Sequence, residues 1–98
     1  MSSVTYLPLS DNDLLATWLH IATDDPVAAD NYLARIQHVC VLIADNPAMG
    51  LERDELKVGV RSFPVERHVI FYVAKDAGIV VLRVWPCAQD PATFALIK

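Results

Sequence analysis

The segment that most constrains the fold of this chain spans residues 58–85 and reads VGVRSFPVERHVIFYVAKDAGIVVLRVW. Its many β-branched and aromatic residues are typical of strands. Three consecutive strands are predicted, over Val58–Phe63, His68–Ala74 and Ile79–Trp85. The first is expected to end before Pro64. A turn over Asp76-Ala77-Gly78, with a positive φ at Gly78, is predicted to join the last two.

Side chains alternate across a strand, so this segment can be sorted into two faces, and both are apolar. One face carries Val69, Phe71, Val73, Val80, Leu82 and Val84. The other carries His68, Ile70, Tyr72, Ile79, Val81, Arg83 and Trp85. Because an antiparallel sheet usually leaves one polar face to water, both faces of this sheet are expected to be covered.

A short strand over Val4–Leu7 and two amphipathic helices are expected before this segment. Ser10 is placed to cap the first helix, where apolar residues recur at steps of three and four. Asp25-Pro26 opens the second helix and Asn46-Pro47 ends it. Only a few residues separate the helices, so they are expected to form an antiparallel hairpin.

The predicted fold is α+β with the order β-αα-βββ, a helical hairpin on one face of an antiparallel sheet, in a single domain over residues 1–98. Counting the reversals of direction places the strand Val58–Phe63 antiparallel to the first strand. The charge-dense segment Met49–Lys57 is expected to be a solvated loop. Because two helices cover one face, the second face is left to another chain or to the tail Phe94–Ile97.

Charge and hydropathy exclude several classes of function. The net charge is −4, and the first 50 residues hold six acidic side chains against one basic one. A chain this acidic is a poor candidate for direct nucleic-acid binding. It has no run of about 20 apolar residues that could cross a membrane and no signal-peptide layout, so a cytoplasmic protein is expected. Cys40 and Cys87 lie far apart and are expected to be free thiols.

No catalytic residue, metal site or cofactor is predicted. The three histidines lie in different elements, and neither they nor the cysteines have the spacing of zinc ligands. What stands out is a group of cationic and aromatic residues on and beside the strands. These are Arg61, Arg67, His68, Tyr72, Arg83 and Trp85. Such a group is either a set of exposed cations stacked on rings, each contributing about 0.5–1 kcal/mol, or a protein-contact surface.

The order of these segments resembles the ParE toxins of the ParE/RelE superfamily. The matching elements are Asp13-Leu14, Pro26 with Ala28-Ala29-Asp30, Ala44-x-x-Pro47-x-x-Gly50, Val60-Arg61-Ser62-Phe63, Val69-Ile70-Phe71-Tyr72 and Leu82-Arg83-Val84. The likeness covers roughly residues 10–90 and rests on the ordered set. It implies the β-αα-βββ fold and the toxin of a bacterial type II toxin–antitoxin pair, held inactive by a ParD-like antitoxin whose C-terminal region wraps the toxin.

The resemblance also implies a target. ParE members poison DNA gyrase, whereas RelE members cut mRNA on the ribosome with basic residues of the third strand and the C-terminal segment. The corresponding stretches here, residues 68–70 and 86–91, hold no arginine, lysine or tyrosine. Because cleavage of RNA needs stabilisation of developing charge, gyrase inhibition by binding is favoured. A ribosome-dependent mRNA endonuclease and a non-toxic antitoxin-binding module are the alternatives.

The antitoxin is predicted to bind the sheet face that bears Arg61, Tyr72, Arg83 and Trp85, with the helices on the opposite face. Arg61 and Arg83 would meet acidic or carbonyl groups of the antitoxin, and Trp85 would fill an apolar pocket as a hot spot. If the tail Phe94–Ile97 covers this face instead, Trp85 is core.

Overall fold

The computed structural model describes residues 2–88 of the chain. In chain order its elements are β1 (Ser3–Tyr6), α1 (Pro8–Ala22), α2 (Pro26–Asp45), the 3-10 turn η1 (Pro47–Met49), β2 (Leu51–Glu52), β3 (Val60–Val65), β4 (His68–Lys75) and β5 (Gly78–Pro86). The predicted α+β order is confirmed, with β2 as an additional short strand. The predicted position of the tail lies outside the described residues.

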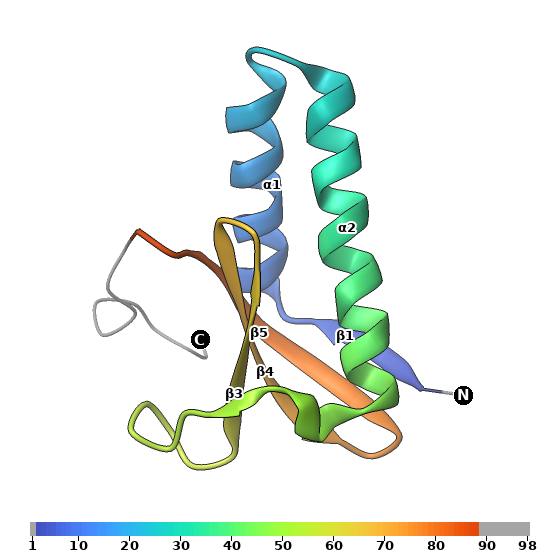
Figure 1. The fold of residues 1–98 in the computed structure, drawn as a ribbon, viewed down its shortest axis with the longest axis vertical. Coiled ribbons are helices and arrows are strands. Elements are labelled where there is room, and N and C mark those ends of the chain that lie inside the picture. Colours follow the sequence, from blue (N-terminus) through green and yellow to red (C-terminus); the bar gives the residue numbers. More distant parts are fainter. Residues whose placement is uncertain (1, 89–98) are drawn as a thin grey trace.

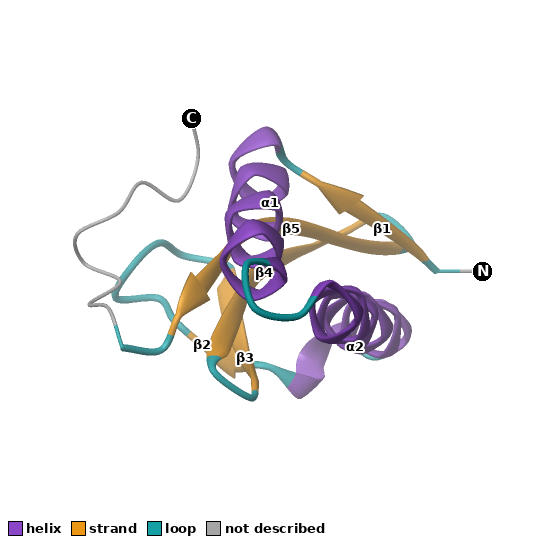
Figure 2. Cartoon of the chain, turned by 90° about the horizontal axis from the view of Figure 1, so that it is seen from above, coloured by secondary structure: helices purple, strands orange, loops and turns teal. Residues whose placement is uncertain are grey.

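The two helices form the predicted antiparallel hairpin, and their connection projects beyond the strands (Figure 1). Viewed from above, both helices lie on the same side of the sheet (Figure 2). Asp25-Pro26 opens α2 as predicted, and the Asp25 carboxylate accepts the N–H groups of Val27 at 3.1 Å and Ala28 at 3.2 Å. The helix ends at Asp45, before Asn46-Pro47.

The predicted cap of α1 is wrong. The helix begins at Pro8 with Leu7 at the N-cap position, because the fixed φ of proline suits the first helical residue. Ser10 therefore lies inside the first turn. Its side chain is fully buried, and its hydroxyl donates to the Leu7 carbonyl at 2.7 Å.

Within residues 2–88 the strands form one sheet in the order β1-β5-β4-β3-β2. β1 pairs with β5 in parallel, and the remaining neighbours are antiparallel, so the sheet is mixed. The prediction that β3 runs antiparallel to β1 is wrong, because β2 adds one reversal of direction. β2 itself lies in the segment that was expected to be a solvated loop. It pairs Leu51 with Ser62 and Glu52 with Arg61.

β3 continues through Pro64, which pairs with Val69 of β4. At that point β3 is the edge of the sheet, because the short β2 faces only Arg61 and Ser62. A proline lacks the backbone N–H, and an edge strand does not need that donor on its open side. The edge position therefore explains why the strand does not end before Pro64.

Gly78 is required, but not for the positive φ that was predicted for it in the turn. The positive φ of the β4–β5 turn, 52°, belongs to Asp76, and Gly78 is already the first residue of β5. A Cβ atom at Gly78 would lie 1.9 Å from the carbonyl oxygen of Ser3. The glycine thus permits the close approach of β1 to β5.

A β-bulge in β5 changes the predicted faces. Phe71 pairs with Arg83, but its neighbour Tyr72 pairs with Val81, so Leu82 is the extra residue. An extra residue reverses the alternation of all side chains that follow it. Val84 consequently joins the face that carries Val81, and Trp85 joins the opposite face.

The helices cover the face that was predicted to bind the antitoxin. Ile70, Tyr72 and Val81 are fully buried in one core with residues of both helices, including Leu14 and Ile36. The opposite face carries a second, smaller buried cluster of Val60, Phe71 and Leu82. The connector after β2 contributes to this cluster, with Leu56 packed against it and the Arg53 guanidinium 5.5 Å from the centre of the Phe71 ring.

Candidate functional site

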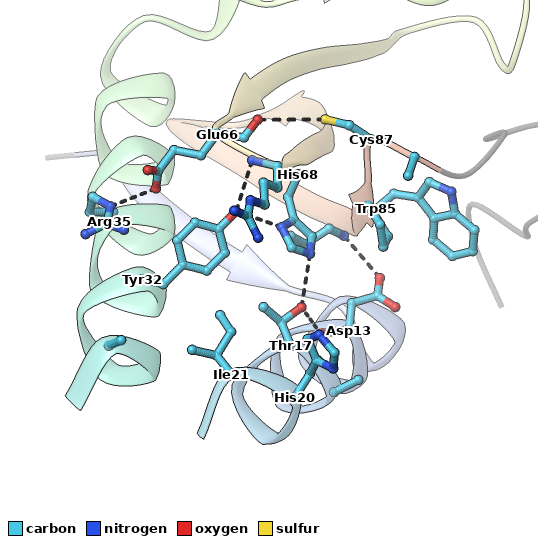
Figure 3. A pocket seen from close by; sticks show the side chains of 16 residues that line it. Asp13, Thr17, His20, Ile21, Tyr32, Arg35, Glu66, His68, Trp85 and Cys87 are labelled. Atoms are coloured by element: carbon cyan, nitrogen blue, oxygen red, sulfur yellow. Dashed lines mark hydrogen bonds and ion pairs between the residues drawn. The ribbon is translucent and has the colours of Figure 1, made fainter. Parts of the chain in front are cut away.

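A groove of about 1020 Å³ lies between the helical hairpin and the sheet, next to the β3–β4 turn and the end of β5. Side chains from widely separated parts of the sequence converge on it (Figure 3). They include Thr17 and Ile21 of α1, Tyr32 of α2, Arg67 of the turn, His68 of β4 and Trp85 of β5. The volume is that of a site for several side chains or a small molecule.

A hydrogen-bonded chain across the floor of the groove connects α2, β4 and α1. The Tyr32 hydroxyl lies 2.7 Å from Nδ1 of His68, and Nε2 of His68 lies 3.3 Å from the Thr17 hydroxyl. Thr17 donates its own proton to the Asp13 carbonyl at 2.9 Å, so it can only accept from His68. These hydrogen bonds are therefore all satisfied when His68 is neutral. Its proton is then on Nε2, and its Nδ1 accepts the hydrogen bond from Tyr32.

Burial lowers the pKa of His68, while the nearby negative charge of Asp13 opposes this effect. The neutral imidazole is thus the favoured form. Burial also raises the pKa of Tyr32, so the phenol keeps its proton. The hydroxyl additionally accepts the backbone N–H of Arg67 at 3.3 Å and lies 3.2 Å from the Val65 carbonyl.

A largely buried ion pair stands beside Trp85. Asp13 Oδ2 accepts a hydrogen bond from Nε of Arg83 at 2.7 Å, and Asp13 Oδ1 accepts one from Nη2 at 2.8 Å. The two side chains are only 14% and 11% exposed. The Arg83 guanidinium lies 4.8 Å from the centre of the Trp85 ring, which lines the groove. The pair therefore holds the Trp85 ring through a cation–π contact.

At the rim of the groove, Arg35 of α2 and Arg67 of the β3–β4 turn differ in whether they form an ion pair. Arg35 forms an exposed ion pair with Glu66 at 2.8 Å, and its guanidinium lies 5.4 Å from the centre of the Tyr32 ring. Arg67 is exposed, and its side chain forms no ion pair with any residue in the described range 2–88. Its backbone carbonyl accepts the N–H of Cys87 at 2.8 Å.

Two of the predicted contact residues bind the segment between α2 and β2. Arg61 donates to the Gly50 carbonyl at 2.7 Å and forms an ion pair with Glu52 at 3.2 Å. Tyr72 is fully buried; its hydroxyl donates to the Pro47 carbonyl at 2.6 Å and accepts the Gly50 N–H at 2.9 Å. Both residues hold the connection between α2 and β2. The prediction that Tyr72 lies on an open sheet face is wrong.

The other two predicted residues, Arg83 and Trp85, are in cation–π contact; Trp85 lines the groove, whereas Arg83 contacts its lining residue Asp13. Asp13, Thr17 and Tyr32 were not among the residues predicted to be functional. Asp13 stood in a segment that matched the family, but its partner is 70 residues away in the sequence. For Tyr32 the signal in the sequence was a polar hydroxyl inside an apolar helical stripe, because such a group needs a hydrogen-bond partner when it is buried.

Two further features of the described residues bear on function. Among residues 2–88, no three His, Cys, Asp or Glu side chains are grouped so that they could hold a metal ion. No helix in the same range has the length and apolar character needed to cross a membrane. Cys40 is buried and Cys87 is exposed, and both are free thiols as predicted.

A helical hairpin packed on a five-stranded mixed sheet, with a groove between the two layers, defines a small α+β protein. The family model described as "ParE toxin of type II toxin-antitoxin system, parDE" matches residues 4–91. This chain therefore belongs to the ParE toxin family, as the sequence predicted.

One solved structure that is similar to the chain is described as "Chromosomal ParDE TA system from P. aeruginosa". The TM-score is 0.73 and the sequence identity is 21%, over 88% of this chain and 96% of that chain. This likeness supports the fold. A comparison with curated proteins found no match.

Proposed function

We propose that this chain is a toxin that inhibits DNA gyrase by binding, in the bacterial cytoplasm, and that a ParD-like antitoxin neutralises it by occupying the groove. Membership of the ParE family supports the toxin role. The feature of the molecule that supports binding over catalysis is the pairing of His68 and Asp13 with other groups of the protein.

Two groups of the groove that could transfer a proton, His68 and Asp13, are engaged inside the protein. His68 contacts Tyr32 through one ring nitrogen and Thr17 through the other. The Asp13 carboxylate is held by Arg83 and by the backbone N–H of Val84 at 3.1 Å. A general acid or base must reach a substrate atom directly or through one water. A groove in which these groups contact each other is better suited to holding a polypeptide.

The lining of the groove is also typical of a peptide-binding site. Its apolar walls include Ile21 of α1, Ala28 of α2 and Trp85 of β5. An amphipathic segment that lies in a groove contributes a few apolar anchors, and tryptophan is prominent among interface hot spots. We expect Trp85 to be the central contact with the antitoxin.

Expression of the chain by itself tests the proposal. Induction is expected to arrest bacterial growth and to reduce the supercoiling of a reporter plasmid, and co-expression of the protein encoded by the adjacent gene should restore both. With purified components, the toxin should inhibit DNA supercoiling by gyrase, and the antitoxin should relieve the inhibition.

The rival functions give different results in the same experiment. Growth arrest with normal supercoiling and ribosome-dependent mRNA cleavage would establish the endonuclease. Harmless expression together with tight binding of the antitoxin would establish a non-toxic binding module.

A further inference from the structure

The arginines around the groove differ in whether they are paired with a carboxylate. Three arginines lie at or beside it, and two of them already have carboxylate partners within the chain. Arg35 is paired with Glu66, and Arg83 is paired with Asp13. Within residues 2–88, the third, Arg67, has no such partner and is exposed at the rim.

The backbone of Arg67 is fixed from two sides, although its side chain is exposed. Its N–H donates to the Tyr32 hydroxyl of α2 at 3.3 Å, and its carbonyl accepts the Cys87 N–H at 2.8 Å. The preceding residue, Glu66, has a positive φ of 52° that closes the two-residue turn between β3 and β4. The turn therefore presents the cation at a defined place on the rim.

We propose that the segment of the antitoxin that fills this groove carries a carboxylate that pairs with Arg67, while its apolar side chains contact Trp85 and Ile21. This inference rests on the proposed function. A ligand that fills the groove removes water from its rim, and a cation that loses water needs an anionic partner. Because Arg35 and Arg83 are already paired, an acidic side chain of the ligand gains the most binding free energy next to Arg67.

A polypeptide ligand fits these charges better than a nucleic acid does. Binding of a phosphate backbone requires several cations on one surface. Within residues 2–88 the groove lining offers one arginine without an ion pair, because Arg35 is paired with Glu66, and the whole chain carries a net charge of −4. A second phosphate would therefore find no further arginine or lysine in this lining that is free of an ion pair. A segment with one acidic residue needs only one.

The test is a charge reversal with a matched control. Arg67→Glu and Lys75→Glu change the net charge equally, but Lys75 is exposed at the end of β4 that lies away from His68 and does not line the groove. The probe is the protein encoded by the gene adjacent to the toxin gene, titrated against each variant after circular dichroism has confirmed the fold. Arg67→Glu should weaken the Kd by about 30-fold or more, and Lys75→Glu by less than about 3-fold, because like charges face to face in an interface strongly oppose binding.

A second measurement identifies the partner group. Replacement of acidic residues of the antitoxin by lysine, one at a time, should reveal one variant that binds Arg67→Glu more tightly than it binds the wild-type toxin. Failure of the wild-type proteins to bind would overturn the proposed function. Binding that is equal for Arg67→Glu and Lys75→Glu would overturn this inference alone. Displacement of the antitoxin by single-stranded RNA at similar concentration would also overturn it.

Discussion

Asp13 of α1 and Arg83 of β5 form a bidentate ion pair, with donor–acceptor distances of 2.7 and 2.8 Å. The last backbone hydrogen bond on this side of β5 runs from the Leu7 N–H to the Val81 carbonyl. Beyond it, the Asp13 carboxylate accepts the N–H of Val84 at 3.1 Å. One side chain thus continues the pairing of β5 after β1 has ended, and it connects the first helix to the last strand.

The first prediction concerns this ion pair. Asp13→Asn should lower the free energy of unfolding by about 3 kcal/mol, because it leaves the guanidinium of Arg83 largely buried without a counter-charge. Urea denaturation measures the change. Arg35→Gln is the control, because the Arg35–Glu66 pair is about half exposed and such pairs contribute roughly 0–1 kcal/mol. Equal losses for the two variants would contradict the interpretation of Asp13.

The second prediction concerns Gly78. Gly78→Ala should displace β1 from β5, because the added Cβ would collide with the Ser3 carbonyl. Overpacking of this kind costs about 1–3 kcal/mol. Amide hydrogen exchange should accelerate selectively over residues 3–6, the whole of β1. Unchanged protection of β1 in the variant would show that the added Cβ is accommodated without displacement of β1.

The third prediction is a pH dependence of stability that originates at His68. Burial lowers its pKa in the folded protein below the ordinary value of 6.5. Between these two values the unfolded chain binds more protons, so the contribution to stability is complete above pH 6.5 and decreases as the pH falls toward the folded pKa. Urea midpoints measured from about pH 8 down to pH 5.5 should show this decrease for the wild type.

His68→Gln is the matched variant for that measurement. It keeps a side chain that can donate and accept hydrogen bonds but removes the titrating group. Its urea midpoint should change less over the same pH range. A wild type and a variant that lose stability in parallel would assign the pH dependence to other groups.

The fourth prediction separates the groove from the core. Trp85→Ala should weaken antitoxin binding by about 2 kcal/mol or more when it is measured at a temperature at which the variant is folded, because its ring also packs on the second cluster. Tyr72→Phe should do the reverse, because it removes the hydrogen bonds to Pro47 and Gly50 beneath the helices and so destabilises the fold by about 1–2 kcal/mol. Isothermal titration and thermal unfolding of both variants provide the comparison. If Trp85→Ala does not fold, Trp85 belongs to the core.

Local signals in the sequence were sufficient for most of the elements and for the family. The β-branched runs located β3, β4 and β5 to within two residues at every end, and Asp25-Pro26 located the start of α2. These features depend on residues that are close in sequence, such as a cap and the N–H groups it accepts. The ordered set of short motifs was likewise enough to indicate the ParE family.

The tertiary structure decided which face of the sheet the helices cover and which residues form the groove. Both faces are apolar, so the alternation of side chains contained no preference between them. The single extra residue Leu82 then exchanged the faces of Val84 and Trp85. β2 is only two residues long and exists because it pairs with β3, yet it reverses the direction of every strand that follows. The contacts Asp13–Arg83 and Tyr32–His68 join residues far apart in the chain, and their geometry is fixed only when the helices dock on the sheet.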